Sequence, residues 1–308
     1  MSLDVSIVIV NHSGDQLTTD CLDSLMAAKS FGGLLHVLVV DNGSPKNYQL
    51  PKRFVNNRSI DVSLMRSESN LGFTGGNNMG IHAAIERYNS DFVLLLNNDT
   101  TVEPYFLFHL LECARLQPSA GLICPKIYFA KGHEFYPDSY SRTQRGKVLW
   151  YAGGSIDWRN LDTFHRGVDE VDVGQFADQQ TSDFATGCCL LIRREVLEKI
   201  GFLDKKMYLY YEDADWSQKA RPFGYTIGYC DKSIIWHINA GSSNGPGSLM
   251  QTYYQTRNRL VFFWRYGSNR ARVTVLRLSA RLLQSGTKTE RLAVWHFLTG
   301  KRGKQPLS

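Results

Sequence analysis

The feature that most constrains this chain is an unbroken apolar run, Phe92–Leu96, that ends abruptly in Asn97, Asn98 and Asp99. A run of Phe, Val and Leu closed by polar residues is typical of a strand buried on both faces, as the central strands of parallel sheets are. Ligands of open α/β sheets bind beyond the carboxyl ends of the strands, where these three polar residues fall. The alternative is that they only form the turn that ends the strand, because Asn and Asp side chains favour turns.

The sequence around this run alternates between strand and helix patterns. Strands are predicted at residues 5–10, 34–40, 60–65, 184–192, 226–230 and 233–236, and helices at 17–26, 81–88, 104–116, 194–200 and after 211. The order implies right-handed crossovers, and therefore an α/β fold with a doubly wound, mostly parallel sheet. The polar stretches 130–147 and 157–180 lack such a period, and we expect them to form long loops around short strands, as flaps over the crevice.

Composition and the cysteines bear on the compartment. With 308 residues and 43% hydrophobic content, the chain can bury a large core. The first strand pattern follows Met1 too closely for a signal peptide, and no apolar run approaches the roughly 18 residues of a membrane span. Six cysteines without C-x-x-C spacing are expected to be reduced thiols, most of them in the core. The expected location is the cytoplasm, either free or as a peripheral protein on the inner face of the cell membrane.

Charge divides the chain in two. From Met250 onward there are twelve Lys and Arg against one acidic residue, Glu290, so this segment carries +11 and residues 1–249 carry −5. We therefore expect a main domain at 1–249, which would carry any active site, and a basic amphipathic helical tail at 250–308. Basic residues alternating with Leu, Phe and Trp predict a tail that lies on an anionic membrane surface. The alternative is an ordinary solvated helix that packs on the sheet.

Four residues with reactive side chains stand at predicted strand ends or at a helix start: Asp41, Asp99, Asp213 and His237. The G-x-G-x-x-G fingerprint is absent after the first strand and from the loop Gly72–Gly80, which argues against a nicotinamide dehydrogenase. A Gly- and Asn-rich entry to a helix can still offer backbone N–H groups to an anion, although such a loop can also be only a turn.

Five ordered motifs resemble those of family 2 glycosyltransferases, and of their bacterial rhamnosyltransferase-like branch most of all. The resemblance covers about residues 4–265 and rests on these segments: Val5-Ser6-Ile7-Val8-Ile9-Val10-Asn11, Val39-Val40-Asp41-Asn42-Gly43-Ser44, Asn70-Leu71-Gly72-Phe73 with Gly76-Asn77-Asn78, Leu95-Leu96-Asn97-Asn98-Asp99, and Tyr211-Glu212-Asp213-Ala214-Asp215-Trp216.

The resemblance implies a GT-A fold and an inverting transferase that uses a nucleoside-diphosphate sugar and Mg²⁺ or Mn²⁺. Asp99 would ligate the metal as the last residue of the family's D-x-D signature, in which Asn97 here replaces the first Asp. Asp41 would contact the nucleobase, with Asn11 in the same pocket. The full set expected at the donor is Asn11, Asp41, Asn70, Gly76, Asn77, Asn97, Asn98 and Asp99.

Chemistry supports these roles. A hard cation would neutralise charge on the leaving diphosphate, and His237 is the expected second ligand, although a lone His at a strand end is often structural. Asp213 is the expected general base, which takes the proton of the acceptor hydroxyl. Glu212, Asp215 and Trp216 are expected to bind or support the acceptor. The alternative for the three carboxylates is that they complement a helix dipole. Arg257 and Asn258 are candidates to face the donor diphosphate.

The sequence thus predicts an inverting, metal-dependent glycosyltransferase. It would transfer a sugar, L-rhamnose from a dTDP donor or another sugar from a UDP donor, to a glycan or lipid-linked saccharide of a bacterial envelope. A sugar-nucleotide nucleotidyltransferase is one alternative, since it too needs an α/β sheet and a metal-binding Asp. A non-enzymatic nucleic-acid binder is another, but it would have no need of the acidic crevice, so no nucleic acid is expected as partner.

Overall fold

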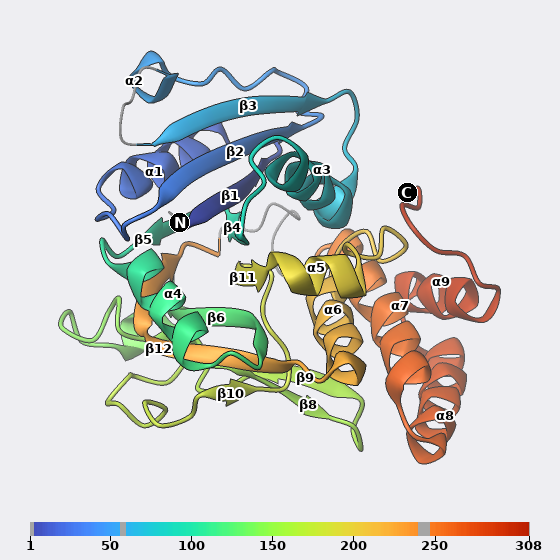
Figure 1. Cartoon of the computed structure of the whole chain (residues 1–308). Helices are drawn as coiled ribbons and strands as arrows, with labels where there is room; N and C mark the ends of the chain where they lie inside the picture. The colour runs from blue at the N-terminus through green and yellow to red at the C-terminus, as the bar shows by residue number, and fades with distance from the viewer. Residues whose placement is uncertain (1–2, 56–59, 240–246, 308) are drawn as a thin grey trace.

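The computed structural model describes residues 3–55, 60–239 and 247–307 (Figure 1). Its strands are β1 (Asp4–Asn11), β2 (Leu34–Asn42), β3 (Asp61–Ser67), β4 (Phe92–Asn97), β5 (Thr100–Val102), β6 (Ala120–Phe129), β7 (Leu149–Tyr151), β8 (Gly154–Asp157), β9 (Asp162–His165), β10 (Thr181–Ser182), β11 (Cys189–Arg193) and β12 (Thr226–His237). Its helices are α1 (Asp15–Met26), α2 (Lys52–Val55), α3 (Gly72–Glu86), α4 (Phe106–Leu116), α5 (Arg194–Ile200), α6 (Glu212–Ala220), α7 (Leu249–Tyr266), α8 (Asn269–Ser285) and α9 (Lys288–Leu298), with 3₁₀ turns η1 (Pro137–Ser139) and η2 (Arg221–Phe223).

The first half of the chain forms a parallel sheet in the order β4-β1-β2-β3. The apolar run of β4 is buried from Phe92 to Leu96 at the centre of the whole sheet, as its sequence predicted. Register aligns the polar strand ends, because Asn11 pairs with Asp41 and Val10 with Asn97. Right-handed crossovers in opposite directions place α1 and α3 on opposite faces. The α/β fold and the doubly wound half are thus confirmed.

The second half of the sheet is mixed. β11 inserts antiparallel between β4 and β6, and β12 runs parallel to β6. The two short strands predicted at 226–230 and 233–236 are one strand, β12, and the gap between them is a register shift between Cys230 and Ile234. The strand β7 lies between the two predicted flap regions and pairs with β6, and the second region contains β9, which forms a hairpin with β8.

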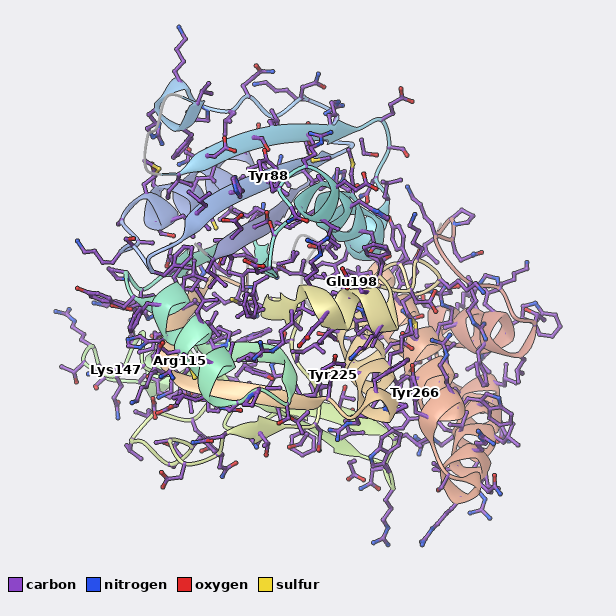
Figure 2. The ribbon with its side chains drawn as sticks, in the orientation of Figure 1. Tyr88, Arg115, Lys147, Glu198, Tyr225 and Tyr266 are labelled. Carbon is purple, nitrogen blue, oxygen red and sulfur yellow. A yellow bond between two sulfur atoms is a disulfide. The ribbon has the colours of Figure 1, made fainter. Side chains whose placement is uncertain are left out.

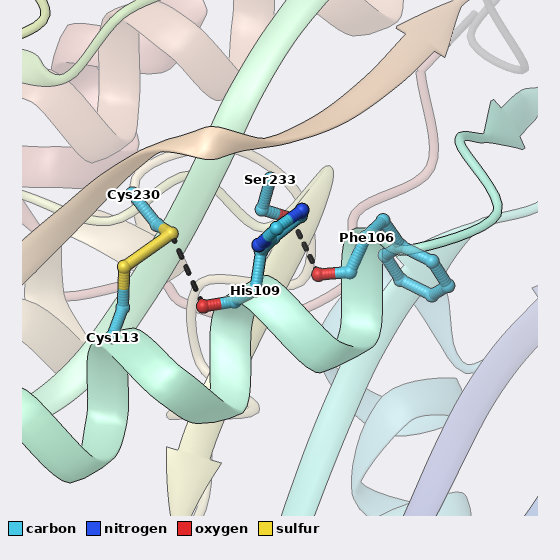
Figure 3. Close-up of a disulfide and its surroundings, with 5 residues drawn as sticks. All are labelled: Phe106, His109, Cys113, Cys230 and Ser233. Carbon is cyan, nitrogen blue, oxygen red and sulfur yellow. Dashed lines mark hydrogen bonds between the residues drawn. A yellow bond between two sulfur atoms is a disulfide. The ribbon is translucent and has the colours of Figure 1, made fainter. Parts of the chain in front are cut away.

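A disulfide and a side-chain hydrogen bond link helix α4 to β12 (Figure 3). Cys113 on α4 forms a disulfide with Cys230 on β12, and Ser233 Oγ donates to the Phe106 carbonyl at 2.8 Å. The expectation of reduced thiols is therefore wrong for this pair, which is separated by 117 residues and meets only because α4 packs on β12. The other four cysteines are free and buried.

The C-terminal helices α7, α8 and α9 pack against one another beside α6 (Figure 1). Eight of the 18 residues of α7 are buried, including Tyr253, Tyr254, Phe262 and Phe263. The last turn of α7 binds α6: Tyr266, labelled beside α6 and α7 in Figure 2, donates to Asp215 Oδ1 at 2.9 Å. The first helix of the predicted tail is thus part of the packed body. None of the described helices has both the length and the apolar character needed to cross a lipid bilayer.

Candidate active site

A cavity of about 650 Å³ opens where the carboxyl ends of β1, β2 and β4 face the segment 208–214 and the hairpin β8–β9. Its size is typical of sites for small ligands. Both halves of the sheet and the first turns of α7 contribute to its walls, so the cavity exists only in the assembled fold.

Four of the predicted donor-binding amides line the wall from the parallel half: Asn70, Asn77, Asn97 and Asn98. Three of these also hold neighbouring backbone or side chains. Asn98 Nδ2 donates to Thr18 Oγ1 at 3.0 Å, Asn70 Oδ1 accepts from the Gly72 N–H at 2.8 Å, and Asn77 Nδ2 donates to the Phe73 carbonyl at 2.9 Å. This wall is therefore polar and held in shape by its own hydrogen bonds.

Asp99, a fifth predicted donor residue, also lines the cavity, and the remaining three lie behind this wall. Asn11 is fully buried, and its Oδ1 accepts from Thr18 Oγ1 at 3.0 Å. Asp41 is 1% exposed and accepts from the backbone N–H of Ser44 and Tyr48 and from Arg66. Burial opposes ionisation of Asp41, but these donors outweigh it and hold the pKa of the carboxyl below its usual range.

Gly76 faces β1 rather than the cavity. A Cβ atom built on it would lie 2.8 Å from Val10 Cγ1 and 3.1 Å from Asn42 Nδ2. The glycine thus allows α3 to approach the sheet closely. Contact of Asn11, Asp41 or Gly76 with a nucleotide stays a prediction.

Asp99 and His237 meet in the cavity wall. His237 Nε2 lies 3.1 Å from Asp99 Oδ1, and both side chains are almost fully buried. They are 138 residues apart in sequence and are brought together because β5 pairs with β12. The other ring nitrogen of His237, Nδ1, is buried without a hydrogen-bond partner.

Asp213 stands in the first turn of α6 and lines the cavity. The Gly187 N–H donates to its Oδ2 at 3.0 Å and the Ala214 N–H to its Oδ1 at 2.7 Å, so the carboxylate is held at both oxygens. Burial nevertheless raises its pKa above the usual value. Glu212 also lines the cavity, and its buried Oε2 has no hydrogen-bond partner. Burial, with the neighbouring Asp213 charge, raises the pKa of Glu212 well above its usual value.

The segment that leads into α6 has an unusual backbone. Tyr208, Tyr210 and Tyr211 all have φ near +68°, a left-handed conformation that costs non-glycine residues about 1 kcal/mol or more each. Asn258, fully buried on α7, holds this segment, since its Nδ2 lies 2.8–3.0 Å from the carbonyls of Met207, Leu209 and Tyr210.

Arg257 completes this clamp from the same helix. Its guanidinium donates to the carbonyls of Lys206, Met207 and Gly303, and the residue is fully buried. The suggestion that Arg257 and Asn258 face the donor diphosphate is therefore wrong. Both donate to backbone carbonyls behind the cavity and position the segment that carries Glu212 and Asp213.

Removal of the Asn258 amide is expected to destabilise the protein. Asn258→Ala leaves up to three buried carbonyls without a donor, so we expect the free energy of unfolding to fall by about 2–4 kcal/mol. Chemical denaturation would measure it. Gln284→Ala, which removes an exposed amide from α8, is the control and should change this free energy by less than about 0.5 kcal/mol. Equal effects of the two variants would contradict the clamp.

Asp215 and Trp216 do not line the cavity. Asp215 is fully buried and forms ion pairs with Arg265 of α7 and with Lys219, at 2.9 Å from Nζ. Trp216 is fully buried in the core, and its Nε1 donates to the Gly201 carbonyl at 2.9 Å. Of the two roles expected for these residues, support is the one that their contacts favour.

Aromatic and imidazole residues of the hairpin region complete the cavity, and sequence reasoning missed them. The Trp150 ring lies edge to face between His237 (4.6 Å between centroids) and His165 (4.3 Å). Burial lowers the pKa of His165 to about 4, so its ring is neutral near pH 7. His12 and Asn42 were also missed, although each stands at a strand end beside a predicted residue, and that position was an available signal.

Comparison with known proteins identifies the family. The family model described as glycosyl transferase family 2 matches residues 6–201. The chain is 26% identical over 258 residues to the low-salt glycan biosynthesis hexosyltransferase Agl10 of Haloferax volcanii, covering 84% of this chain and 75% of that protein. It is 25% identical over 229 residues to the N-acetylglucosaminyl-diphospho-decaprenol L-rhamnosyltransferase of Mycobacterium tuberculosis, covering 71% of this chain and 72% of that protein.

Solved structures share the fold. GalNAc-T7, solved with UDP, GalNAc and Mn²⁺, superposes with a TM-score of 0.65 at 16% identity, over 98% of this chain and 55% of that one. The mannosyltransferase PcManGT of Pyrobaculum calidifontis, solved with GDP-Man and Mn²⁺, superposes with a TM-score of 0.55 at 14% identity, over 97% of this chain and 80% of that one. The expected GT-A α/β fold is confirmed, and the chain belongs to glycosyl transferase family 2.

Proposed function

We propose that this glycosyltransferase transfers a sugar from a nucleoside-diphosphate donor to a hydroxyl group, with inversion at the anomeric carbon and with a divalent cation. The observation that carries the proposal is the composition of one cavity. The Asp99–His237 pair and the hydrogen-bonded carboxylate of Asp213 line the same space, together with the polar amides of Asn70, Asn77, Asn97 and Asn98.

The residues present fit a divalent cation. Among the described residues, no group of three His, Cys, Asp or Glu side chains could hold a metal ion. Asp99 offers carboxylate oxygens, and His237 offers an imidazole with one buried nitrogen that lacks a hydrogen-bond partner. One or two protein ligands with substrate phosphates and water are the usual arrangement for Mg²⁺ in phosphate chemistry, and Mn²⁺ accepts both oxygen and nitrogen. When bound, the cation would neutralise negative charge on the leaving diphosphate.

The protein's own groups account for the proton. Asp213 takes the proton of the acceptor hydroxyl as its oxygen attacks the anomeric carbon, and the bond between that carbon and the donor phosphate oxygen breaks. The products are the glycosylated acceptor, a nucleoside diphosphate and protonated Asp213, which releases its proton to water. One displacement without a covalent intermediate inverts the configuration. The raised pKa of Asp213 makes it a stronger base than an ordinary aspartate.

The donor we propose is dTDP-L-rhamnose, and the acceptor a lipid-linked saccharide or glycan of a bacterial envelope. One relative is named an L-rhamnosyltransferase of a decaprenol-linked sugar, and another a hexosyltransferase of glycan biosynthesis. The cavity lining includes apolar rings, among them Phe135, Trp150 and Phe164, which we propose contact the acceptor. Such rings stack on the apolar faces of sugars. A UDP-hexose donor is the alternative.

A donor panel tests this function. Purified protein would be incubated with dTDP-rhamnose, UDP-glucose, UDP-N-acetylglucosamine or GDP-mannose and a saccharide-diphospholipid acceptor, with Mg²⁺, Mn²⁺ or a chelator. We expect transfer from one donor, its loss with the chelator, and an inverted anomer by NMR. Retained configuration or metal-independent transfer would contradict the mechanism. Release of diphosphate from a nucleoside triphosphate and a sugar phosphate would instead establish a nucleotidyltransferase.

A further inference from the structure

The outer surface of the C-terminal helices exposes large apolar side chains at regular positions. Seven of them are between 38% and 56% exposed. They are Trp264 on α7, Val273, Leu276 and Leu283 on α8, and Leu292, Trp295 and Leu298 on α9. We call these seven residues the apolar outer face. Helices α7, α8 and α9 pack on one another through their buried sides. The seven residues of the apolar outer face lie outside this packing.

Helix α8 shows the pattern most clearly. Its inner side buries Ala271, Val275 and Ser279. On the other side, Val273, Leu276, Ala280 and Leu283 follow one another at intervals of three or four residues, so they form one exposed stripe along the helix. Three exposed arginines, Arg270, Arg277 and Arg281, form a parallel row beside this stripe.

Helix α9 and the end of α7 extend the same surface. Leu292, Trp295 and Leu298 recur every third residue on α9, and the exposed Lys288 and Arg291 precede them on the same helix. The Trp264 ring lies 6.2 Å from the ring of Phe297 on α9 and 6.0 Å from the guanidinium of Arg272 on α8. Trp264 therefore connects the exposed residues of α7 with those of α8 and α9 into one surface.

The charge of this surface is mostly positive. Among the described residues, none of Arg270, Arg277, Arg281, Lys288 and Arg291 forms an ion pair. The acidic residue of this region, Glu290, accepts from Thr287 in a capping box at the start of α9. The basic side chains are thus available to an anionic partner.

We propose that the apolar outer face and its five basic neighbours bind the surface of an anionic membrane. Leu and Trp enter the boundary between head groups and acyl chains, while Arg and Lys bind anionic head groups. A second copy of the chain fits less well, since a two-fold contact would bring arginine rows together. A nucleic acid would use the charge but leave the apolar stripe without a partner. This proposal does not depend on the sugar transferred.

The bound orientation has a consequence for the cavity. Met250, Gln251 and Gln255 of α7 line the cavity, and Trp264 of the same helix belongs to the apolar outer face. One rigid helix therefore connects the two. The lipid of a lipid-linked acceptor would stay in the bilayer, next to the apolar outer face. Its saccharide would then reach the cavity along the side of the molecule on which α7 lies.

Vesicle flotation tests the proposal with full-length protein. The vesicles are phosphatidylcholine alone, or phosphatidylcholine with about one third phosphatidylglycerol. We expect binding to the anionic vesicles only. Arg270→Gln/Arg277→Gln/Arg281→Gln should lower the partition coefficient by about a hundredfold, since each basic residue near an anionic surface contributes about fivefold. Leu276→Ser/Leu283→Ser should lower it by about tenfold or more.

Matched controls separate this surface from general charge and hydrophobicity. Arg87→Gln/Arg142→Gln/Lys147→Gln removes the same charge from exposed positions elsewhere, and Figure 2 labels Lys147 on the side away from α8 and α9. Leu116→Ser/Phe223→Ser removes two apolar residues that are 67% and 54% exposed. Both controls should bind vesicles within twofold of wild type, because substitutions at exposed positions away from the binding surface have only small effects.

Four outcomes would overturn the proposal. The first is absence of wild-type binding to anionic vesicles while thermal unfolding shows folded protein. The second is an equal loss in test and control variants. The third is unchanged vesicle binding by the Leu276→Ser/Leu283→Ser variant together with displacement by an oligonucleotide, which would assign the surface to nucleic acid. Dimerisation in size-exclusion chromatography that these leucine substitutions abolish would assign it to a second copy.

Discussion

Asp213→Asn is expected to lower kcat by about 10²–10⁴-fold, the usual contribution of a general base. The amide keeps the shape of the carboxylate but cannot accept the proton of the acceptor hydroxyl. Affinity for the nucleoside diphosphate should stay within about threefold, because the donor is proposed to bind at Asp99 and His237. Steady-state kinetics and calorimetric titration of the nucleotide would measure the two effects separately.

Two controls accompany this variant. Asp178→Asn changes an exposed aspartate and should leave kcat unchanged. Glu212→Gln changes the carboxyl beside Asp213 in the same cavity. A loss of about 10²–10⁴-fold in kcat by Glu212→Gln, together with little loss by Asp213→Asn, would identify Glu212 as the base. Loss of nucleotide binding by Asp213→Asn would show that the residue was assigned the wrong role.

The pH profile follows from the same carboxylate. A general base acts in its ionised form, so the rate falls as the pH drops through its pKa. Since burial raises the pKa of Asp213 above its usual value of 3.8, the acid limb of kcat/KM should lie above that pH. A profile that stayed flat down to the range of ordinary aspartates would contradict the raised pKa.

Asp99→Asn is expected to abolish metal-dependent nucleotide binding, with a loss of affinity on the order of a hundredfold, as for a cation worth several kcal/mol. The substitution removes the negative charge that the cation requires and leaves the amide similar in shape. Calorimetric titration of dTDP and UDP, with and without Mn²⁺ or Mg²⁺, would measure it. His237→Ala should reduce affinity in the same direction, with metal-independent binding unchanged.

The chain contains a matched control for this pair. His36 Nδ1 lies 3.2 Å from Asp61 Oδ2 where β2 pairs with β3, outside the residues that line the cavity. Asp61→Asn and His36→Ala should leave nucleotide and metal binding unchanged. Metal-dependent binding that survives in Asp99→Asn would refute the assigned cation site.

Much of the fold and part of the site were predictable from local sequence. The apolar run of β4 indicated a buried central strand because continuous burial requires continuous apolar residues. Parallel strands end at one edge of a sheet, so Asn97 and Asp99 were expected at a common site. Five motifs in order identified the family before any contact was known.

Other predictions depended on directions that sequence spacing did not settle. Asp213 and Asp215 are two residues apart on α6, and successive residues of a helix turn by about 100°. One carboxylate therefore faces the cavity and the other faces Arg265 of α7. Cys113 and Cys230 lie in two separate apolar segments, and the sequence gives no sign that the two are in contact. Only the packing of α4 on β12 brings their sulfurs together.

Local sequence patterns and composition were enough to predict the main strands and helices of the parallel half, the polar ends of its strands, the family and the basic character of the C-terminal helices. Three features appear only in the folded chain: Asp99 meets His237, Asn258 and Arg257 hold the tyrosine segment rather than a phosphate, and Trp150 stands between two imidazoles. Each of these contacts joins segments far apart in the chain. Their geometry is set by the packing of the whole sheet and its helices, which no local pattern contains.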